Sequence, residues 1–244
     1  MRMSRRAEAA ARLREAQEKG YAESDPTADV GGLDAARKLV ILASIAFNTR
    51  IDLSDVLVEG IDGLDLCDIE HGKELGYAIK LLAIAKNNAE HGISVCVRPT
   101  MLPVSHPLAG VNDVFNAIFV HGNVLGDAMF YGSGAGKLPT ASAVVADVVD
   151  AAKHLHRNVV TRWDAGELEL IPNAEAEHRF FVRVQGRSEA QKEQIREAFG
   201  SVEIVETEGL EDEFGFITEV MTEGTYSKKA EAFPEIIHMI RLAD

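Results

Sequence analysis

The chain has 244 residues, of which 46% are hydrophobic and 26% charged, so it is long and apolar enough to form a sizeable buried core. Its formal net charge of -14 opposes binding to nucleic acid or to an anionic membrane surface. The longest apolar run, residues 39–47, is too short to span a bilayer, and the two cysteines lack metal-ligand spacing, so we expect a cytoplasmic protein without a bound metal.

The first part of the chain is predicted to mix helices and strands. Apolar residues recur at helical spacing over 6–19 and 34–48, and a loop rich in Asp, Pro and Gly at 21–32 separates these two helices. A third helix is predicted over 140–156, after a glycine-rich turn. Four apolar segments are typical of strands paired in two hairpins, residues 76–88 with 91–103 and residues 114–120 with 124–130.

The second part of the chain is predicted to be a separate small module. Residues 155–178 have no sustained helical period and contain Gly, Pro and Asn, which indicates a linker. A βαββα pattern follows, with strands at 179–186, 201–208 and 214–223 and helices at 188–199 and 227–241. We therefore expect an α/β (α+β) protein with a mixed-sheet domain at 1–160, a linker at 161–177 and a ferredoxin-like domain at 178–244.

Charged residues gather in the loop at 21–32 and in the helix after it. Glu23, Asp29 and Asp34 precede Lys38, which stands one helical turn after Asp34. One interpretation is a surface ion pair, with Asp34 favoured near the positive end of the helix dipole. In the alternative, the carboxylates bind the ammonium group of an amino-acid substrate, and Lys38 donates a proton to a carbonyl oxygen as hydride reaches the carbon.

The glycine-rich turn YGSGAGKLP could present the free amides of the next helix to an anion or a cofactor. It departs from a phosphate-binding P-loop where Tyr131 replaces glycine and Leu138 replaces Ser or Thr. Lys137 stands where the dinucleotide fingerprint needs a third glycine, so a tight structural turn is the alternative. His106 and His121 form no metal-ligand pattern, and neither is assigned a catalytic role.

Several motifs occur in an order that resembles the homoserine dehydrogenase family. They are GYAESDPTADVGGLDAARKLVILA, VEGI, GYAIKLLAIAK, VRPTMLP, HPLAGVNDVFNAIFV and YGSGAGKLPTASAVVAD. The resemblance covers roughly residues 13–150, and the ordered series is far more specific than any one motif.

The resemblance implies an activity and a set of substrate residues. The activity is reversible reduction of aspartate 4-semialdehyde to homoserine with NADP or NAD as cofactor, the branch-point step toward threonine, methionine and isoleucine. Glu23 and Asp34 are implied to bind the amino group and hydroxyl of homoserine, Lys38 to relay the proton, and Asp29 to be a weaker candidate for substrate contact. A homodimer acting on this small molecule is implied as well.

The resemblance also implies where the cofactor binds. Gly134 and Gly136 correspond to the loop that approaches the nicotinamide end. The family's Rossmann domain and a segment resembling NGTTNFIL are not found in this sequence, so we expect most cofactor contacts to come from a domain that is encoded separately or lost by truncation. We therefore expect no hydride transfer by the chain alone. The alternatives are an inactive amino-acid-binding regulatory remnant and a truncated fragment.

The C-terminal module resembles an ACT domain, a βαββαβ unit that many members of this family carry for feedback control by threonine. Residues 186–189 differ from the usual Asp, Pro and Gly loop before the first helix of that module. The last strand of the module is expected to be missing or very short.

Overall fold

The computed structural model describes residues 27–88, 92–158, 160 and 169–243. The described residues divide into two compact units, one within the range 105–163 and the other within the ranges 27–104 and 164–244. The expected domains at 1–160 and 178–244 remain a prediction. The helix expected at 6–19 lies outside the described residues.

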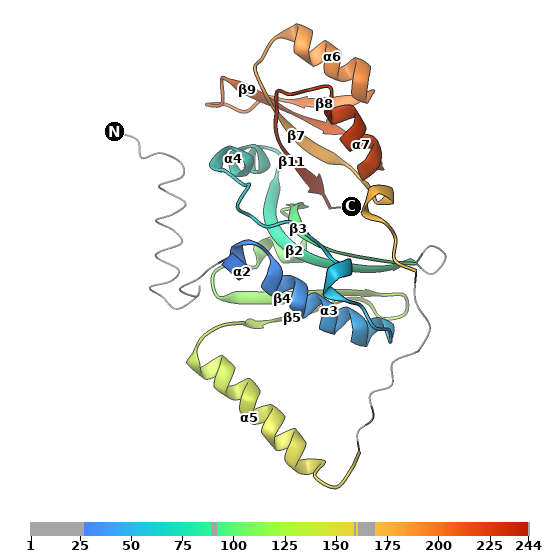
Figure 1. Ribbon diagram of the computed structural model, residues 1–244. Coiled ribbons are helices and arrows are strands. Elements are labelled where there is room, and N and C mark those ends of the chain that lie inside the picture. The colour runs from blue at the N-terminus through green and yellow to red at the C-terminus, as the bar shows by residue number, and fades with distance from the viewer. Residues whose placement is uncertain (1–26, 89–91, 159, 161–168, 244) are drawn as a thin grey trace. The chain divides into compact units, whose positions relative to one another are not determined.

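A mixed sheet organises the unit that contains 27–104 and 164–244 (Figure 1). Its described strands are β1 (Leu57–Val58), β2 (Tyr77–Asn88), β3 (Gly92–Pro103), β7 (Phe180–Gln185), β8 (Val202–Val205), β9 (Glu213–Thr218) and β11 (Ile236–Leu242). The strand order is β1-β3-β11-β7-β9-β8, and β2 also pairs with β3. β3 is parallel to β1 and β11, and the other neighbours are antiparallel.

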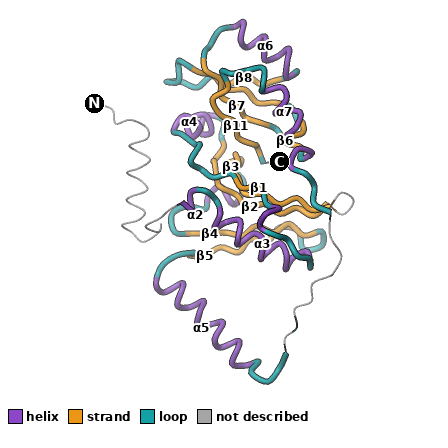
Figure 2. Tube along the Cα trace, in the orientation of Figure 1, coloured by secondary structure: helices purple, strands orange, loops and turns teal. Residues whose placement is uncertain are grey.

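The helices of this unit cover different parts of the sheet, as the tube view in Figure 2 also shows. They are α2 (Thr27–Val30), α3 (Leu33–Phe47), α4 (Leu66–Glu74), α6 (Glu189–Phe199) and α7 (Glu223–Ala230), with short 3-10 turns at Leu53–Asp55 and Asn173–Glu175. Apolar residues of α3 pack against β3, and those of α6 and α7 pack against β7 and β9. A two-stranded ladder, β6 (Glu177–His178) with β10 (Met221–Thr222), lies outside the main sheet.

A third apolar cluster joins the two halves of the sheet. Met101 from β3 packs with Phe181 from β7 and with Ile240 and Leu242 from β11. The register pairs Leu242 with Met101 on one side of β11 and Ile240 with Phe181 on the other. The C-terminal strand therefore connects the segment at 92–103 to the rest of the C-terminal module through backbone hydrogen bonds and a shared core.

The unit formed by 105–163 contains a hairpin and a helix. β4 (Phe115–Gly122) pairs antiparallel with β5 (Gly126–Ser133), and α5 (Lys137–Lys153) follows; a 3-10 turn, Pro107–Gly110, precedes them. The rings of Phe115 and Tyr131 stack across the hairpin at 4.8 Å. None of the helices in the described part of the chain is long and apolar enough to cross a membrane.

The mixed α/β class and both hairpins expected from the sequence are confirmed. The helix expected at 227–241 is wrong, because α7 ends at Ala230 and β11 follows, which changes the predicted βαββα order to βαββαβ. The expectation of a missing last strand is therefore also wrong. Pro234 disfavours helical backbone in the residue before it, and the apolar run after it enters the sheet as a strand. Helix α4 was not predicted.

Candidate active site

The turn between α2 and α3 is held tightly against the segment at 59–61. Ile61 N–H donates to the carbonyl of Val30 at 2.8 Å, and Glu59 N–H donates to the carbonyl of Val97 in β3 at the same distance. A Cβ added to Gly60 would lie 2.5 Å from the Val30 oxygen and 2.8 Å from the Gly31 Cα, so only glycine permits this approach. The GG and EGI motifs thus fix the start of α3 on the sheet.

Asp34 and Lys38 occupy the first turns of α3, on the face opposite its buried side. Lys38 Nζ donates to Asp34 Oδ2 at 2.6 Å, and the two side chains are 67% and 44% exposed. Ala36 and Leu39 of the same helix are buried against the sheet. The i,i+4 ion pair expected from the sequence is present, and it leaves the ammonium group accessible to a small molecule.

Asp29 lies in the short helix α2 and is exposed. Its backbone carbonyl accepts a hydrogen bond from Gly32 N–H at 3.2 Å, which helps to close the turn before α3. Asp29 and Asp34 therefore belong to the same local structure, five residues apart across the turn. Glu23 lies outside the described residues.

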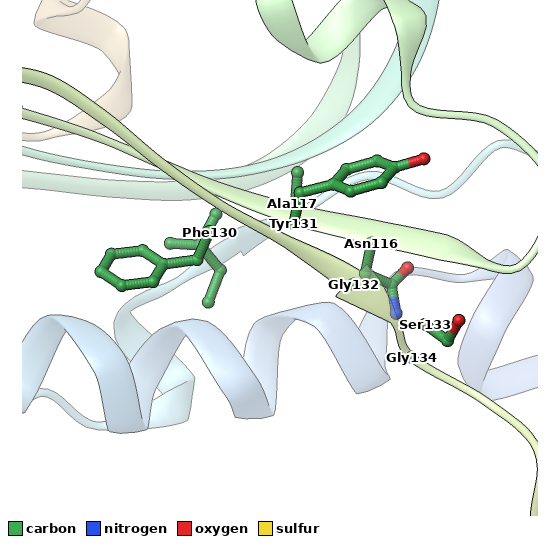
Figure 3. A pocket seen from close by; sticks show the side chains of 8 residues that line it. Asn116, Ala117, Phe130, Tyr131, Gly132, Ser133 and Gly134 are labelled. Atoms are coloured by element: carbon green, nitrogen blue, oxygen red, sulfur yellow. The ribbon is translucent and has the colours of Figure 1, made fainter. Parts of the chain in front are cut away.

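Gly134 and Gly136 lie in the connection between β5 and α5, in the other compact unit. A Cβ on Gly134 would overlap the Asn116 side chain at 1.6 Å, and Figure 3 shows Asn116 beside Ser133 and Gly134. Gly136 has φ 114°, a conformation that favours glycine. An open pocket of about 280 Å³ adjoins this turn, lined by residues 116–118 and 130–134. Gly134 therefore leaves room for the Asn116 side chain, and Gly136 allows a backbone conformation that other residues rarely adopt.

One buried ionic network lies in the same unit as the α2–α3 turn and includes Glu59 of the EGI motif. Arg241 in β11 donates to Glu59 through both Nη1 and Nη2, the latter to Oε1 at 3.0 Å. It also donates from Nε to Glu223 Oε1 at 2.7 Å. Arg98 in β3 donates to the same Glu223 oxygen at 3.0 Å and to His178 Nε2 at 2.8 Å. Burial and the charge of Arg98 lower the pKa of His178 to about 4, so the ring is neutral at pH 7.

A second buried network centres on Arg183 in β7. Its Nη1 donates to Asp65 and Asp68 at the start of α4, both at 2.8 Å, and its Nη2 donates to Glu213 at 2.8 Å. His71 of α4 lies 3.3 Å from Glu213, and burial lowers the pKa of this ring despite the nearby carboxylate. This network fixes α4 to β7 and β9.

Sequence reasoning missed both networks, although a signal for them was present. Arg98, Arg183 and Arg241 each interrupt a strongly apolar strand, and the structure buries all three. A charged residue within a buried strand needs a partner, because an unpaired ion in a protein core is costly. The partners Glu59, Glu223 and Asp68 are distant in sequence, so only the folded chain identifies them.

The chain resembles known proteins over most of its length. A family model described as homoserine dehydrogenase matches residues 1–149. The homoserine dehydrogenase of Corynebacterium glutamicum is 56% identical over 146 residues, which is 58% of this chain and 33% of that protein. The homoserine dehydrogenase of Mycobacterium tuberculosis is 37% identical over 249 residues, covering 94% of this chain and 56% of that protein. The chain thus spans only part of the curated relatives it matches.

The chain is also similar to solved structures of homoserine dehydrogenases. A homoserine dehydrogenase from Thiobacillus denitrificans has a TM-score of 0.84 and 34% identity, over 95% of this chain and 57% of that one. The enzyme from S. aureus, at pH 7.0, has a TM-score of 0.75 and 33% identity, over 95% of this chain and 58% of that one. Together, the family model, the sequence relatives and the shared mixed α/β fold show that the chain belongs to the homoserine dehydrogenase family, a family of oxidoreductases.

Proposed function

We propose that this chain is the substrate-binding part of a homoserine dehydrogenase, which interconverts aspartate 4-semialdehyde and homoserine. The observation that carries the proposal is the Lys38–Asp34 ion pair, exposed on α3 at a turn that two close-packed glycine segments hold in place. An ammonium group held by one carboxylate and open to solvent can donate a proton to a substrate oxygen. Family membership supplies the reaction class.

The proposed mechanism assigns a task to each residue. Asp34 and Glu23 bind the amino and hydroxyl groups of homoserine, and Asp29 makes a further contact from the same turn. Lys38 donates a proton to the carbonyl oxygen of the semialdehyde as the carbon is reduced, and it accepts that proton in the reverse direction. Asp34 orients the Lys38 ammonium through the 2.6 Å hydrogen bond.

The turn with Gly134 and Gly136 fits the nicotinamide end of NADP or NAD, which supplies the hydride when bound. This assignment is supported by the resemblance to the family and by the open pocket that adjoins the turn. The remaining cofactor contacts come from residues outside those described, on the same polypeptide or on a separate nucleotide-binding subunit.

The family also provides proposals for the whole protein. We infer a cytoplasmic homodimer that serves threonine, methionine and isoleucine synthesis. Apart from the two-residue strand β10, which lies outside the main sheet, the module has the order β7-α6-β8-β9-α7-β11. This βαββαβ order supports an ACT-like regulatory role for the C-terminal module, because it is the order of that domain. Sedimentation of the purified chain tests the dimer, and calorimetry with threonine tests the regulatory role.

Turnover and binding together test the proposed function. NADPH oxidation with aspartate 4-semialdehyde is measured for the chain alone and mixed with a separately expressed nucleotide-binding domain of the family, and homoserine binding is measured by calorimetry. We expect Lys38→Met to lower kcat by roughly 10²–10⁴-fold, the usual contribution of a positioned acid. Arg50→Met, which removes an exposed ion pair with Asp52 in the same unit, is the matched control and should keep full activity.

The outcomes separate the alternatives. Activity only in the mixture indicates that the cofactor contacts lie on another chain. Homoserine binding without turnover in either sample favours a regulatory module. Turnover by the Lys38→Met protein equal to that of the unmodified chain contradicts the role of Lys38.

A further inference from the structure

We propose that Arg241, in the C-terminal strand β11, is a positioning residue that holds the α2–α3 turn in place through Glu59. The inference that Arg241 influences homoserine binding rests on the proposed function. The inference that Arg241 positions the turn does not. Arg241 lies outside the residues that the family model matches, and Glu59 lies within them. The C-terminal module thereby becomes part of what shapes the substrate site.

The contact between Arg241 and Glu59 is specific and largely buried. Both terminal nitrogens of the guanidinium donate to the two oxygens of the Glu59 carboxylate, a bidentate geometry. The Arg241 side chain is 7% exposed and that of Glu59 is 36% exposed. On its other edge, Arg241 donates to both oxygens of Glu223 at 2.7 and 2.9 Å, so the guanidinium cannot rotate away from Glu59 without losing those bonds.

Glu59 is connected directly to the turn that carries the substrate residues. The next residue, Gly60, lies against Val30 and Gly31 with no room for a Cβ, and Ile61 N–H donates to the Val30 carbonyl. Gly32, which follows, is the N-cap of α3 and packs on Val97 of β3. A displacement of Glu59 must therefore displace residues 30–32, and Asp34 lies only two residues beyond them.

Arg183 provides a matched control. It is as buried as Arg241, it lies on the neighbouring strand β7, and it also bridges the C-terminal module to carboxylates of the 57–104 segment. Its partners there are Asp65, the N-cap of α4, and Asp68 in the first turn of that helix, not the α2–α3 turn. Arg183→Met should therefore loosen the fold to a comparable degree while leaving the substrate turn unchanged.

Hydrogen exchange of the full chain tests the positioning role without any ligand. The reporters are the amides of Gly31, Gly32 and Ile61, each hydrogen-bonded within the turn. Glu59→Gln, which removes the charge and preserves the shape, is expected to speed their exchange about tenfold or more, the usual consequence of losing a charge-assisted hydrogen bond. Arg241→Lys should restore part of the protection that Arg241→Met loses. Arg183→Met should speed exchange in α4 but not in the turn.

Calorimetry with homoserine tests whether the Arg241–Glu59 contact influences substrate binding. Glu59→Gln is expected to weaken binding about tenfold, whereas Arg183→Met should leave the Kd within twofold of the unmodified chain. If the unmodified chain does not bind homoserine, the proposed function fails and the exchange data still decide the positioning role. Unchanged exchange of the Gly31, Gly32 and Ile61 amides in Glu59→Gln would overturn the inference. If Arg241→Met does not fold, the exchange rates of Glu59→Gln alone test the positioning role. This variant should fold, because Glu59 is the more exposed partner of the ion pair.

Discussion

The close packing of the proposed substrate turn can be tested by adding one methyl group at Gly60. A side chain there would lie within 2.8 Å of Asp62 Oδ1, Gly31 and the Val30 oxygen. We expect Gly60→Ala to lower the free energy of unfolding by ~1–3 kcal/mol, because the backbone of the turn must move. Urea unfolding measures this. Gly63→Ala is the control, since a Cβ at Gly63 meets only the His238 ring, at 3.6 Å. Equal stability of the two variants would contradict the close approach.

His178 is expected to make stability depend on pH. Burial and Arg98 lower its pKa from 6.5 to about 4, so between these values the unfolded chain binds a proton that the folded chain excludes. The stabilisation is present above pH 6.5 and is lost as pH falls toward 4. Between pH 7 and 5 the loss is about 2 kcal/mol. The His178→Gln protein should show a correspondingly smaller change in urea unfolding; an equal change in both proteins would refute this role for His178.

At the scale of single elements, helix α6 has a well-defined N-terminal cap. The Ser188 hydroxyl accepts a hydrogen bond from Gln191 N–H at 3.2 Å, and the Gln191 side chain accepts one from Ser188 N–H at 3.1 Å. We expect Ser188→Ala to lower the free energy of unfolding by ~0.5–2 kcal/mol. Thermal unfolding followed by circular dichroism measures the change. Ser201→Ala, just beyond the other end of the helix, should have no such effect.

Local sequence patterns predicted most elements, and they failed where tertiary context decides. Alternating apolar segments predicted the β2–β3 and β4–β5 hairpins, and Ser188 marked the start of α6. The short apolar run at 236–242 is compatible with either a helix or a strand. It forms β11 because its backbone pairs with β3 on one side and with β7 on the other. Helix α4 has its own signal, since Asp65 and Asp68 form a capping box, but the low apolar content of the helix concealed it.

The candidate site was only partly predictable, for a similar reason. Asp34 and Lys38 are four residues apart, so their ion pair follows from helical spacing alone. The Arg241–Glu59 contact joins residues 182 positions apart, and no local period contains it. Motif resemblance identified Gly134 and Gly136, whereas spacing alone also allowed a simple turn there. Long-range polar contacts are therefore what the sequence did not reveal.

For the molecule as a whole, one sheet extends across the boundary expected between two domains. β11 pairs with β3 on one side and β7 on the other, within a single compact unit. We expect residues 92–103 and 213–218 to lose protection at the same urea concentration in hydrogen-exchange mass spectrometry, because they share this sheet. Peptides from β4 and β5 provide an internal comparison from the other unit. Two separate transitions within the sheet would contradict this expectation.

The central place of β11 also has a consequence for synthesis on the ribosome. Of the strands described in this sheet, β11 is the last in the chain, yet it lies between strands made long before it. Until residues 236–242 leave the exit tunnel, β3 and β7 each present a row of backbone groups that awaits a partner. The nascent chain therefore completes this sheet only after residues 236–242 have been made, and the interval before that is when chaperones are most needed to prevent association through those edges.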